Sequence, residues 1–333
     1  MPSILVPVAL ALSLQAPAEP APPAPTAQMK EEASAIAAFV QSPLAKTFLG
    51  GFECLPPIPT RVAYYNKETR SALSETAAKG MSPEALAGFA PRDIDERFYY
   101  FTRYGTPVAF VRPVEILGQA GVKSPDGLKV VDFGFGSIGQ LRVLASLGAH
   151  VAGIEVDPLL QVIYGGENGP VARCAKAGPG RDGEVRLVFG QFPADPPVAA
   201  EVGGGYDVFI SKNTLKRGYV HPEREVDPRM LVHLEVDDET FVRAVYELLN
   251  PGGFALIYNL CPAPSAPEEP YKPWADGRSP FSRETWEKVG FKVIAFDTDD
   301  TQAAREMGRT FGWGTDEELA KDLFGMYTLV RKP

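Results

Sequence analysis

From Leu128 to the end of the chain, short apolar runs alternate with amphipathic stretches whose apolar residues recur at helical spacing. The first amphipathic stretch carries Ile138, Leu141 and Leu144, and it ends at Gly148. The apolar runs predict seven strands, at 129–133, 151–156, 184–189, 206–210, 254–259, 291–296 and 326–331. This alternation predicts a doubly wound α/β fold, in which helices cover both faces of a mostly parallel sheet.

Three long segments interrupt the alternation, at 211–238, 260–281 and 297–325. Segments of this length inside a compact domain usually hold functional loops or extra helices. In the last of them, Thr315 and Glu318 form a capping-box pattern, which predicts a helix there.

The preceding region, residues 28–121, is predicted to be mainly helical. Ser42 and Ser82 each precede a proline, and an N-cap residue followed by proline is typical of a helix start. Two aromatic clusters, at 61–66 and 98–105, are expected to pack in the core or to line a pocket. Within them, Tyr64 and Tyr65 are candidates to cap a substrate pocket, and Tyr100, Arg103 and Tyr104 are candidates to close over a ligand bound by the region that follows.

The start of the chain is similar to a secretory signal: an apolar run at 4–14 precedes a tract rich in proline and alanine that reaches Ala27. No Lys or Arg precedes the run, and Pro7 interrupts it. Five prolines between Pro17 and Pro25 are expected to keep this tract out of the packed fold. The predicted organisation is a signal-like segment, a helical cap region and a nucleotide-binding domain, at 1–27, 28–121 and 122–333.

Composition narrows the classes of function. Hydrophobic residues make up 45% of the chain and charged residues 23%, as in an ordinary globular protein. A net charge of -9 argues against a general affinity for nucleic acid. The apolar run at 4–14 is too short to remain as a membrane span in a mature chain. The oligomeric state is left open.

Cysteine and histidine are both scarce. The three cysteines are widely separated and odd in number, so we expect neither a disulfide framework nor a cysteine zinc site; they are Cys54, Cys174 and Cys261. With only three histidines in the chain, a histidine-rich metal site is not expected either. We therefore predict that the protein works without a metal.

Residues 130–139, with the sequence VVDFGFGSIG, predict a buried strand, a glycine-rich turn and the start of a helix. The next strand ends in Glu155. Glycines let the backbone approach a ligand closely, and a carboxylate at this distance accepts hydrogen bonds from ribose hydroxyls. Taken alone, the GxGxxG spacing slightly favours a dinucleotide, whereas Asp132, two residues before the first glycine, favours another nucleotide.

Asp132, Gly134 and Gly136 match the Asp-x-Gly-x-Gly motif of class I S-adenosylmethionine-dependent methyltransferases, which the chain resembles from about residue 128 onward. Further matching positions are the pair after the third strand, the turn before the fifth strand, and the final Gly-Phe and strand, at Gln191-Phe192, Pro251-Gly252-Gly253, Gly290-Phe291 and 326–330. The resemblance implies a last strand that runs antiparallel and S-adenosylmethionine as the cofactor. The implied cofactor-binding residues are Asp132, Gly134, Phe135, Gly136, Glu155, Val156, Gln191, Phe192 and Ser211.

The chain departs from the family pattern in three places. Ile138 stands where a third motif glycine is common, and Gly139 follows one position later. Gln191 replaces the more usual aspartate beside adenine, and the connection before the last strand is long. The first departure leaves an NAD(P)-dependent oxidoreductase as an alternative, and a non-catalytic binding protein with the same fold is a third possibility.

In open α/β sheets the acceptor binds beyond the carboxyl ends of the strands, and the polar segment after the fourth strand lies there. We expect Asn213, Lys212 and His221 to be catalytic: Asn213 to orient the acceptor, and His221 to act as a base near neutral pH. Lys216 and Arg217 are candidates to pair with an anionic group of the substrate.

The sequence therefore predicts methyl transfer from S-adenosylmethionine to an unidentified acceptor. We expect a small molecule, and a peptide or protein is the less favoured alternative. The location of the protein is left open. The signal-like start favours export to the periplasm or the medium, but the cofactor is made in the cytosol, which favours the cytoplasm.

Overall fold

The computed structural model describes residues 23–103 and 105–333. The apolar run at 4–14 and Tyr104 therefore lie outside the described residues, and the signal-peptide prediction stays a prediction. Helix α1 (Pro25–Ile36) begins inside the tract that was expected to stay out of the fold, because Pro25 takes the first helical position, where its missing N–H is not needed. Within the described ranges, no helix is long and apolar enough to cross a bilayer.

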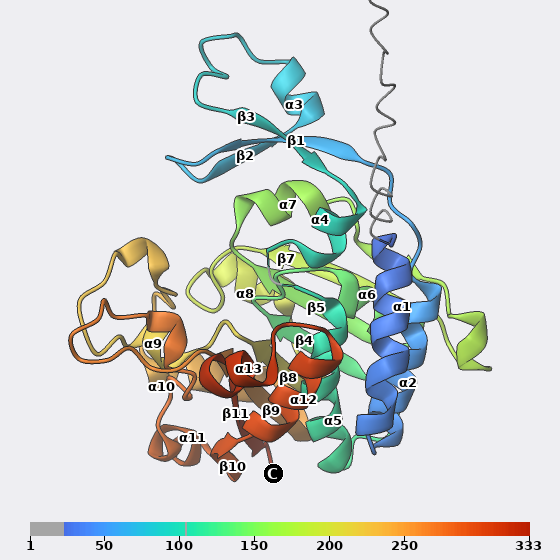
Figure 1. The fold of residues 1–333 in the computed structure, drawn as a ribbon, viewed down its shortest axis with the longest axis vertical. Coiled ribbons are helices and arrows are strands. Elements are labelled where there is room, and N and C mark those ends of the chain that lie inside the picture. Colours follow the sequence, from blue (N-terminus) through green and yellow to red (C-terminus); the bar gives the residue numbers. More distant parts are fainter. Residues whose placement is uncertain (1–22, 104) are drawn as a thin grey trace, which may run out of the picture.

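The centre of the molecule is an eight-stranded sheet with the order β10-β11-β9-β8-β4-β5-β7-β6 (Figure 1). Its strands are β4 (Lys129–Phe133), β5 (His150–Glu155), β6 (Gly169–Val171), β7 (Gly183–Phe189), β8 (Tyr206–Lys212), β9 (Leu249–Cys261), β10 (Lys292–Asp299) and β11 (Phe324–Arg331). Strands β4, β5, β7, β8 and β9 are parallel, and β11 is antiparallel to both of its neighbours.

This sheet confirms the predicted fold class. All seven expected strands are present, and the bounds of β4 are those read from the apolar run. The eighth strand, β6, is antiparallel at the outer edge and was not expected, because three residues are too few to form a pattern. The expected capping box at Thr315 and Glu318 is present and begins α13 (Asp316–Asp322).

Helices cover both faces of the sheet, because adjacent strand residues point to opposite faces. Val130 belongs to the core formed with helices α1, α2, α5, α6, α7 and α12, whereas Val131 belongs to the core formed with α8, α10 and α11. The helices that follow β4 are α6 (Gly139–Ser146), α7 (Pro158–Tyr164), α8 (Pro196–Val202), α9 (Arg217–Val220), α10 (Asp238–Leu248), α11 (Arg283–Val289) and α12 (Thr301–Thr310).

Helices make up most of the regular structure before β4, as expected, but they enclose a second sheet that was not predicted. The helices are α1, α2 (Pro43–Gly51), α3 (Glu75–Lys79), α4 (Glu96–Phe101) and α5 (Val111–Gln119). Ser42 caps α2 through Ala45, as predicted, whereas the residues after Ser82 form turns and no helix, so that helix start is wrong. The first aromatic cluster, residues 61–66, is a strand.

The second sheet has three antiparallel strands in the order β2-β1-β3, and we call it the arm: β1 (Arg61–Asn66), β2 (Ser71–Ser74) and β3 (Ala90–Ile94). The arm stands above α7 in Figure 1, beyond the carboxyl ends of the parallel strands. Tyr65 packs toward the main core, whereas Tyr64, its neighbour along the strand, points to the opposite face. The tip of the β1–β2 hairpin reaches the segment after β8, where the Arg70 guanidinium donates a hydrogen bond to the carbonyl of Arg229 at 2.9 Å.

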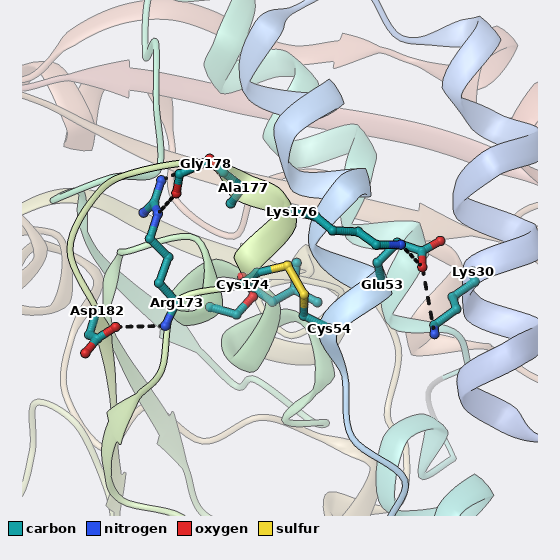
Figure 2. The surroundings of a disulfide bond; sticks show 11 residues. Lys30, Glu53, Cys54, Arg173, Cys174, Lys176, Ala177, Gly178 and Asp182 are labelled. Atoms are coloured by element: carbon teal, nitrogen blue, oxygen red, sulfur yellow. Dashed lines mark hydrogen bonds and ion pairs between the residues drawn. A yellow bond between two sulfur atoms is a disulfide. The ribbon is translucent and has the colours of Figure 1, made fainter.

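A disulfide joins Cys54 to Cys174, although no disulfide framework was expected from the sequence (Figure 2). Cys54 ends the short helix after α2, and Cys174 lies between β6 and β7, so the bond ties the N-terminal helices to the sheet. Beside it, Lys176 forms an ion pair with Glu53 at 2.8 Å. The odd count was misleading because Cys261 is a buried free thiol on β9.

Glu115 shows how the N-terminal helices are held together. Its buried carboxylate on α5 accepts hydrogen bonds from the backbone N–H and the hydroxyl of Ser42, from the N–H of Gln41 and from the amide of Gln119. We expect Glu115→Ala to lower the free energy of unfolding by about 2–4 kcal/mol, because buried donors lose their acceptor. Urea denaturation monitored by circular dichroism measures this loss, and Glu115→Gln, which keeps one acceptor oxygen, should lose clearly less.

Candidate active site

The carboxyl ends of β4 and β8 form the point at which the winding of the sheet reverses. The chain leaves β4 through α6 toward β5, whereas it leaves β8 through α10 toward β9, on the other side. Ligands of doubly wound sheets bind in the crevice at this point. We call this end of the sheet the switch-point crevice, after the position at which such sheets bind ligands, and most of the predicted site residues come from the ends of β4, β5 and β8.

The glycine turn after β4 adopts the backbone conformation that its sequence requires. Gly134 and Gly136 have φ angles of +69° and +63°, which other residues rarely adopt. A Cβ atom at Gly134 would lie 2.3 Å from the hydroxyl oxygen of Thr214, which itself donates a hydrogen bond to the Gly134 carbonyl at 3.1 Å. Gly139, the displaced third glycine, packs against Pro107. A Cβ atom built on Gly139 would lie 2.5 Å from the Cγ of Pro107. A glycine at position 139 therefore lets the start of α6 pack against the N-terminal region.

Asp132 is the buried carboxylate of the crevice, 1% exposed. Its Oδ2 accepts a hydrogen bond from the amide of Gln140 at 3.3 Å. Its Oδ1 has no hydrogen-bond partner in the part of the chain that the structure describes. Burial, opposed by the Gln140 hydrogen bond, raises the pKa of Asp132 to about 7. A buried acceptor without a donor is costly, so this oxygen is suited to a ligand that brings an N–H or O–H group.

Glu155 ends β5, as predicted, and its carboxylate faces backbone donors. Oε2 accepts from the N–H of Gly136 at 3.2 Å, and Oε1 accepts from Val156 and Asp157 at 2.8 and 3.2 Å. Burial raises the pKa of Glu155, and these three hydrogen bonds oppose the shift. A carboxylate has about four acceptor positions, so one remains on Oε2. The side chain of Val156 is 55% exposed beside it.

Three predicted cofactor residues have side chains that pack in the protein. The ring of Phe135 lies between Tyr164 and Phe189, and the ring of Phe192 lies against Phe133 and Phe241. Ser211 is fully buried, and its hydroxyl donates to the carbonyl of Phe133 at 3.1 Å. These three residues therefore contribute backbone or scaffold to the crevice. Gln191, by contrast, is half-buried, and its side chain makes no hydrogen bond with the residues the structure describes.

The three predicted catalytic residues separate in the structure. Lys212 is the last residue of β8 and is half-buried, and Asp132 lies close enough to influence its pKa. Asn213 turns the chain with a φ of +65°, and its side-chain oxygen accepts from the N–H of Leu260 at 2.7 Å, so its role is to hold two loops together. His221 is exposed at the surface, 2.9 Å from Asp238.

His221 lines a hollow of about 190 Å³ formed by residues 220–221, 232–236 and 238, and no residue of the glycine turn lines it. The structure therefore does not bring His221 together with Asp132 or Lys212. Within the described ranges, no three His, Cys, Asp or Glu side chains are placed to hold a metal ion.

The segment after α4 lies over the glycine turn. The hydroxyl of Thr102 donates to the Gly136 carbonyl at 3.3 Å, and Arg103 forms an ion pair with Asp157. Arg103 was expected to close over the cofactor, and it reaches the tip of β5 next to Glu155. Tyr100 points away, because its hydroxyl donates to the carbonyl of Pro56 at 2.7 Å.

Sequence reasoning missed Thr102, Gln140 and Thr214, the polar side chains that hold the turn and Asp132. No spacing signals them, because Thr102 and Thr214 come from separate elements and act by single hydrogen bonds, and Gln140 bonds to the turn and Asp132 only once α6 has formed.

These residues fit S-adenosylmethionine at its amino-acid end. The free Oδ1 of Asp132 suits an ammonium group, and the two turn glycines bring no side chains between it and a ligand. At the ribose end the fit is limited by hydrogen-bonding capacity, because backbone N–H groups already use three of about four acceptor positions of Glu155. Binding both ribose hydroxyls there requires Glu155 to give up at least one backbone donor.

Comparison with known proteins identifies no family for this chain. No family model matches the sequence, and no curated protein matches it. The [4+2]-cyclase SpnF is 15% identical with a TM-score of 0.40, over 67% of this chain and 80% of its own. Phosphoethanolamine N-methyltransferase 2 of Haemonchus contortus is 16% identical with a TM-score of 0.40, over 72% of this chain and 57% of its own.

An S-adenosylmethionine-dependent methyltransferase from Mesorhizobium loti is 18% identical with a TM-score of 0.35, over 64% of this chain and 94% of its own. All three TM-scores lie below 0.5, so these likenesses carry no argument. The agreement with the expected fold rests on the sheet itself, its strand order and its antiparallel last strand.

Proposed function

We propose that the protein transfers the methyl group of S-adenosylmethionine to a small-molecule acceptor bound in the switch-point crevice. The observation that carries this proposal is the free Oδ1 of buried Asp132, which lies next to a turn with two glycines of positive φ. A simple structural turn would not need a buried carboxylate with an unused acceptor.

The cofactor supplies a methyl group on a sulfonium, which an acceptor removes by in-line displacement. The protein residues mainly bind and orient the two partners. Asp132 accepts a hydrogen bond from the cofactor ammonium, Glu155 accepts from a ribose hydroxyl, and Lys212 lies on the acceptor side of the crevice. We leave Asn213 and His221 out of the reacting groups, because Asn213 is bound to Leu260 and His221 lies at a separate surface hollow.

The arm supports a small acceptor. It stands beyond the carboxyl ends of the strands, and its tip is bound to the segment after β8 through Arg70. We infer that this enclosure by the arm and the segment after β8 favours a small acceptor over a folded protein.

Titration calorimetry with S-adenosylhomocysteine tests the cofactor directly. We expect micromolar or tighter binding, and no binding of NAD at the same concentrations. Glu155→Gln should weaken S-adenosylhomocysteine about tenfold or more, because a hydrogen bond to a charged group contributes roughly 1.5–3 kcal/mol. Glu184→Gln is the control, since Glu184 is exposed at the amino end of β7. Binding of NAD alone would establish the oxidoreductase in place of our proposal.

If S-adenosylhomocysteine binds but a broad panel of small acceptors yields no methylated product, the non-catalytic binding protein becomes the better description. Product detection by mass spectrometry makes this distinction.

A further inference from the structure

Lys212 presents an unpaired cation at the switch-point crevice. It is the last residue of β8, opposite the glycine turn, and its side chain is half-buried. Among the residues that the structure describes, its ammonium group has no hydrogen bond and no ion pair. An ammonium group has three donors, which need acceptors wherever water is restricted.

Lys216 adds a second positive charge near the same strand end. It is 4% exposed, and its ammonium group donates to the carbonyls of Leu260 at 2.5 Å and Trp274 at 3.1 Å. Burial lowers the pKa of Lys216 to about 8. Burial and the charge of Lys216 together lower the pKa of Lys212 to about 8. Both groups therefore still carry most of their charge at neutral pH.

Negative charge does not balance these lysines. Asp132 is the carboxylate that acts on Lys212, and its raised pKa of about 7 leaves it partly protonated at neutral pH. Asp276, on the neighbouring loop, forms ion pairs with Arg278 and Arg217. The β8 side of the crevice thus has an excess of positive charge, and a partly buried cation is stabilised by an anion that binds it directly.

We propose that the acceptor carries an oxyanion, a carboxylate or a phosphate, that binds the ammonium group of Lys212. The inference rests on the proposed methyl transfer, and it names the class of molecule that the crevice selects. Lysine suits either oxyanion, because it acts as a compact point charge with three donors. The oxyanion would anchor the acceptor on the β8 side and leave the glycine turn and Asp132 to the cofactor.

The test measures anion binding to the full chain with S-adenosylhomocysteine already bound. Acetate and inorganic phosphate are titrated separately at constant ionic strength, and the melting temperature is followed. We expect a saturable rise with at least one of the two anions, because a ligand that binds only the folded state stabilises it. The anion with the larger response identifies the kind of oxyanion. Lys212→Met should weaken this response at least tenfold, and Lys212→Arg should retain it in part.

Lys129→Met is the matched control, because Lys129 is exposed at the amino end of β4, at the opposite edge of the sheet. It should respond as the unmodified protein does. An unchanged response in Lys212→Met overturns the inference, and so does the absence of any response in the unmodified protein. The inference is also overturned if the anion raises the melting temperature without S-adenosylhomocysteine but not when S-adenosylhomocysteine is saturating. Lys212 would then hold the carboxylate of the cofactor. Failure of the proposed function is seen separately, as no binding of S-adenosylhomocysteine.

Discussion

Reduction of the disulfide between Cys54 and Cys174 is expected to lower the free energy of unfolding by several kcal/mol. The bond closes a loop with a sequence separation of 120 residues. In the chain-entropy model, a loop of this length restricts the unfolded chain by about 5 kcal/mol. A loss of this size is comparable to the whole stability of many domains, so the reduced protein should be partly unfolded at physiological temperature.

The measurement is urea denaturation of the Cys54→Ser/Cys174→Ser variant against the unmodified protein, each with and without reductant. The background should carry Cys261→Ala, because a third thiol would otherwise allow exchange. Reductant should move the transition of the disulfide-containing protein to that of the double variant and leave the double variant unchanged. Equal transitions in all four samples would mean that the bond does not form or does not constrain the chain.

The disulfide also bears on whether the protein is exported or stays in the cytoplasm. Stable disulfides are typical of oxidising compartments, which agrees with the signal-like start of the sequence. The proposed cofactor is made in the cytosol, which favours a cytoplasmic protein. N-terminal sequencing of the mature protein from separated cell fractions, combined with thiol labelling of Cys54 and Cys174, decides between the two.

The parts predicted from the sequence are those fixed by local pattern. The strand at 129–133, the capping box at Thr315 and the turn glycines at 134 and 136 depend on neighbours along the chain, and the structure agrees with each. The disulfide was missed because only the tertiary fold brings together cysteines that lie 120 residues apart.

The arm was missed for another reason. In the run 61–66, Tyr64 and Tyr65 are adjacent aromatic residues, which removes the alternation that marks a strand with one buried face.

The candidate site shows the same division between local and distant determinants. Asp132 and Glu155 were predicted from the glycine-turn motif, and the structure brings them together because each lies at or near the end of a parallel strand, and parallel strands bring their carboxyl ends to one edge. His221 does not lie with them in the structure. The chain after β8 turns at Asn213, and His221 then lies beside Asp238 at the start of α10. That turn depends on a left-handed residue held by Leu260, which no spacing in the sequence reveals.

The second large effect concerns Asp132, whose replacement should change binding and stability in opposite directions. In Asp132→Asn, S-adenosylhomocysteine should bind roughly 10- to 150-fold more weakly, because a hydrogen bond between charged groups contributes about 1.5–3 kcal/mol. In the unmodified protein, affinity should rise from pH 6 to pH 8, since the carboxyl group has a pKa of about 7 and must ionise to receive the cofactor ammonium. Asp132→Asn should lack this pH dependence.

Without a ligand, the same variant should be more stable than the unmodified protein at pH 8. Burial raises the pKa of Asp132 from 3.8 to about 7, so the folded state binds more protons than the unfolded state in this range. The stability that the protonated group provides is fully present below pH 3.8 and is lost as the pH rises through 7. Asparagine avoids this loss, and we expect a gain of about 2–4 kcal/mol at pH 8, smaller at pH 5.5. Urea denaturation at both pH values measures it. A variant that loses both binding and stability at pH 8 would show that Asp132 supports the fold and does not serve a ligand.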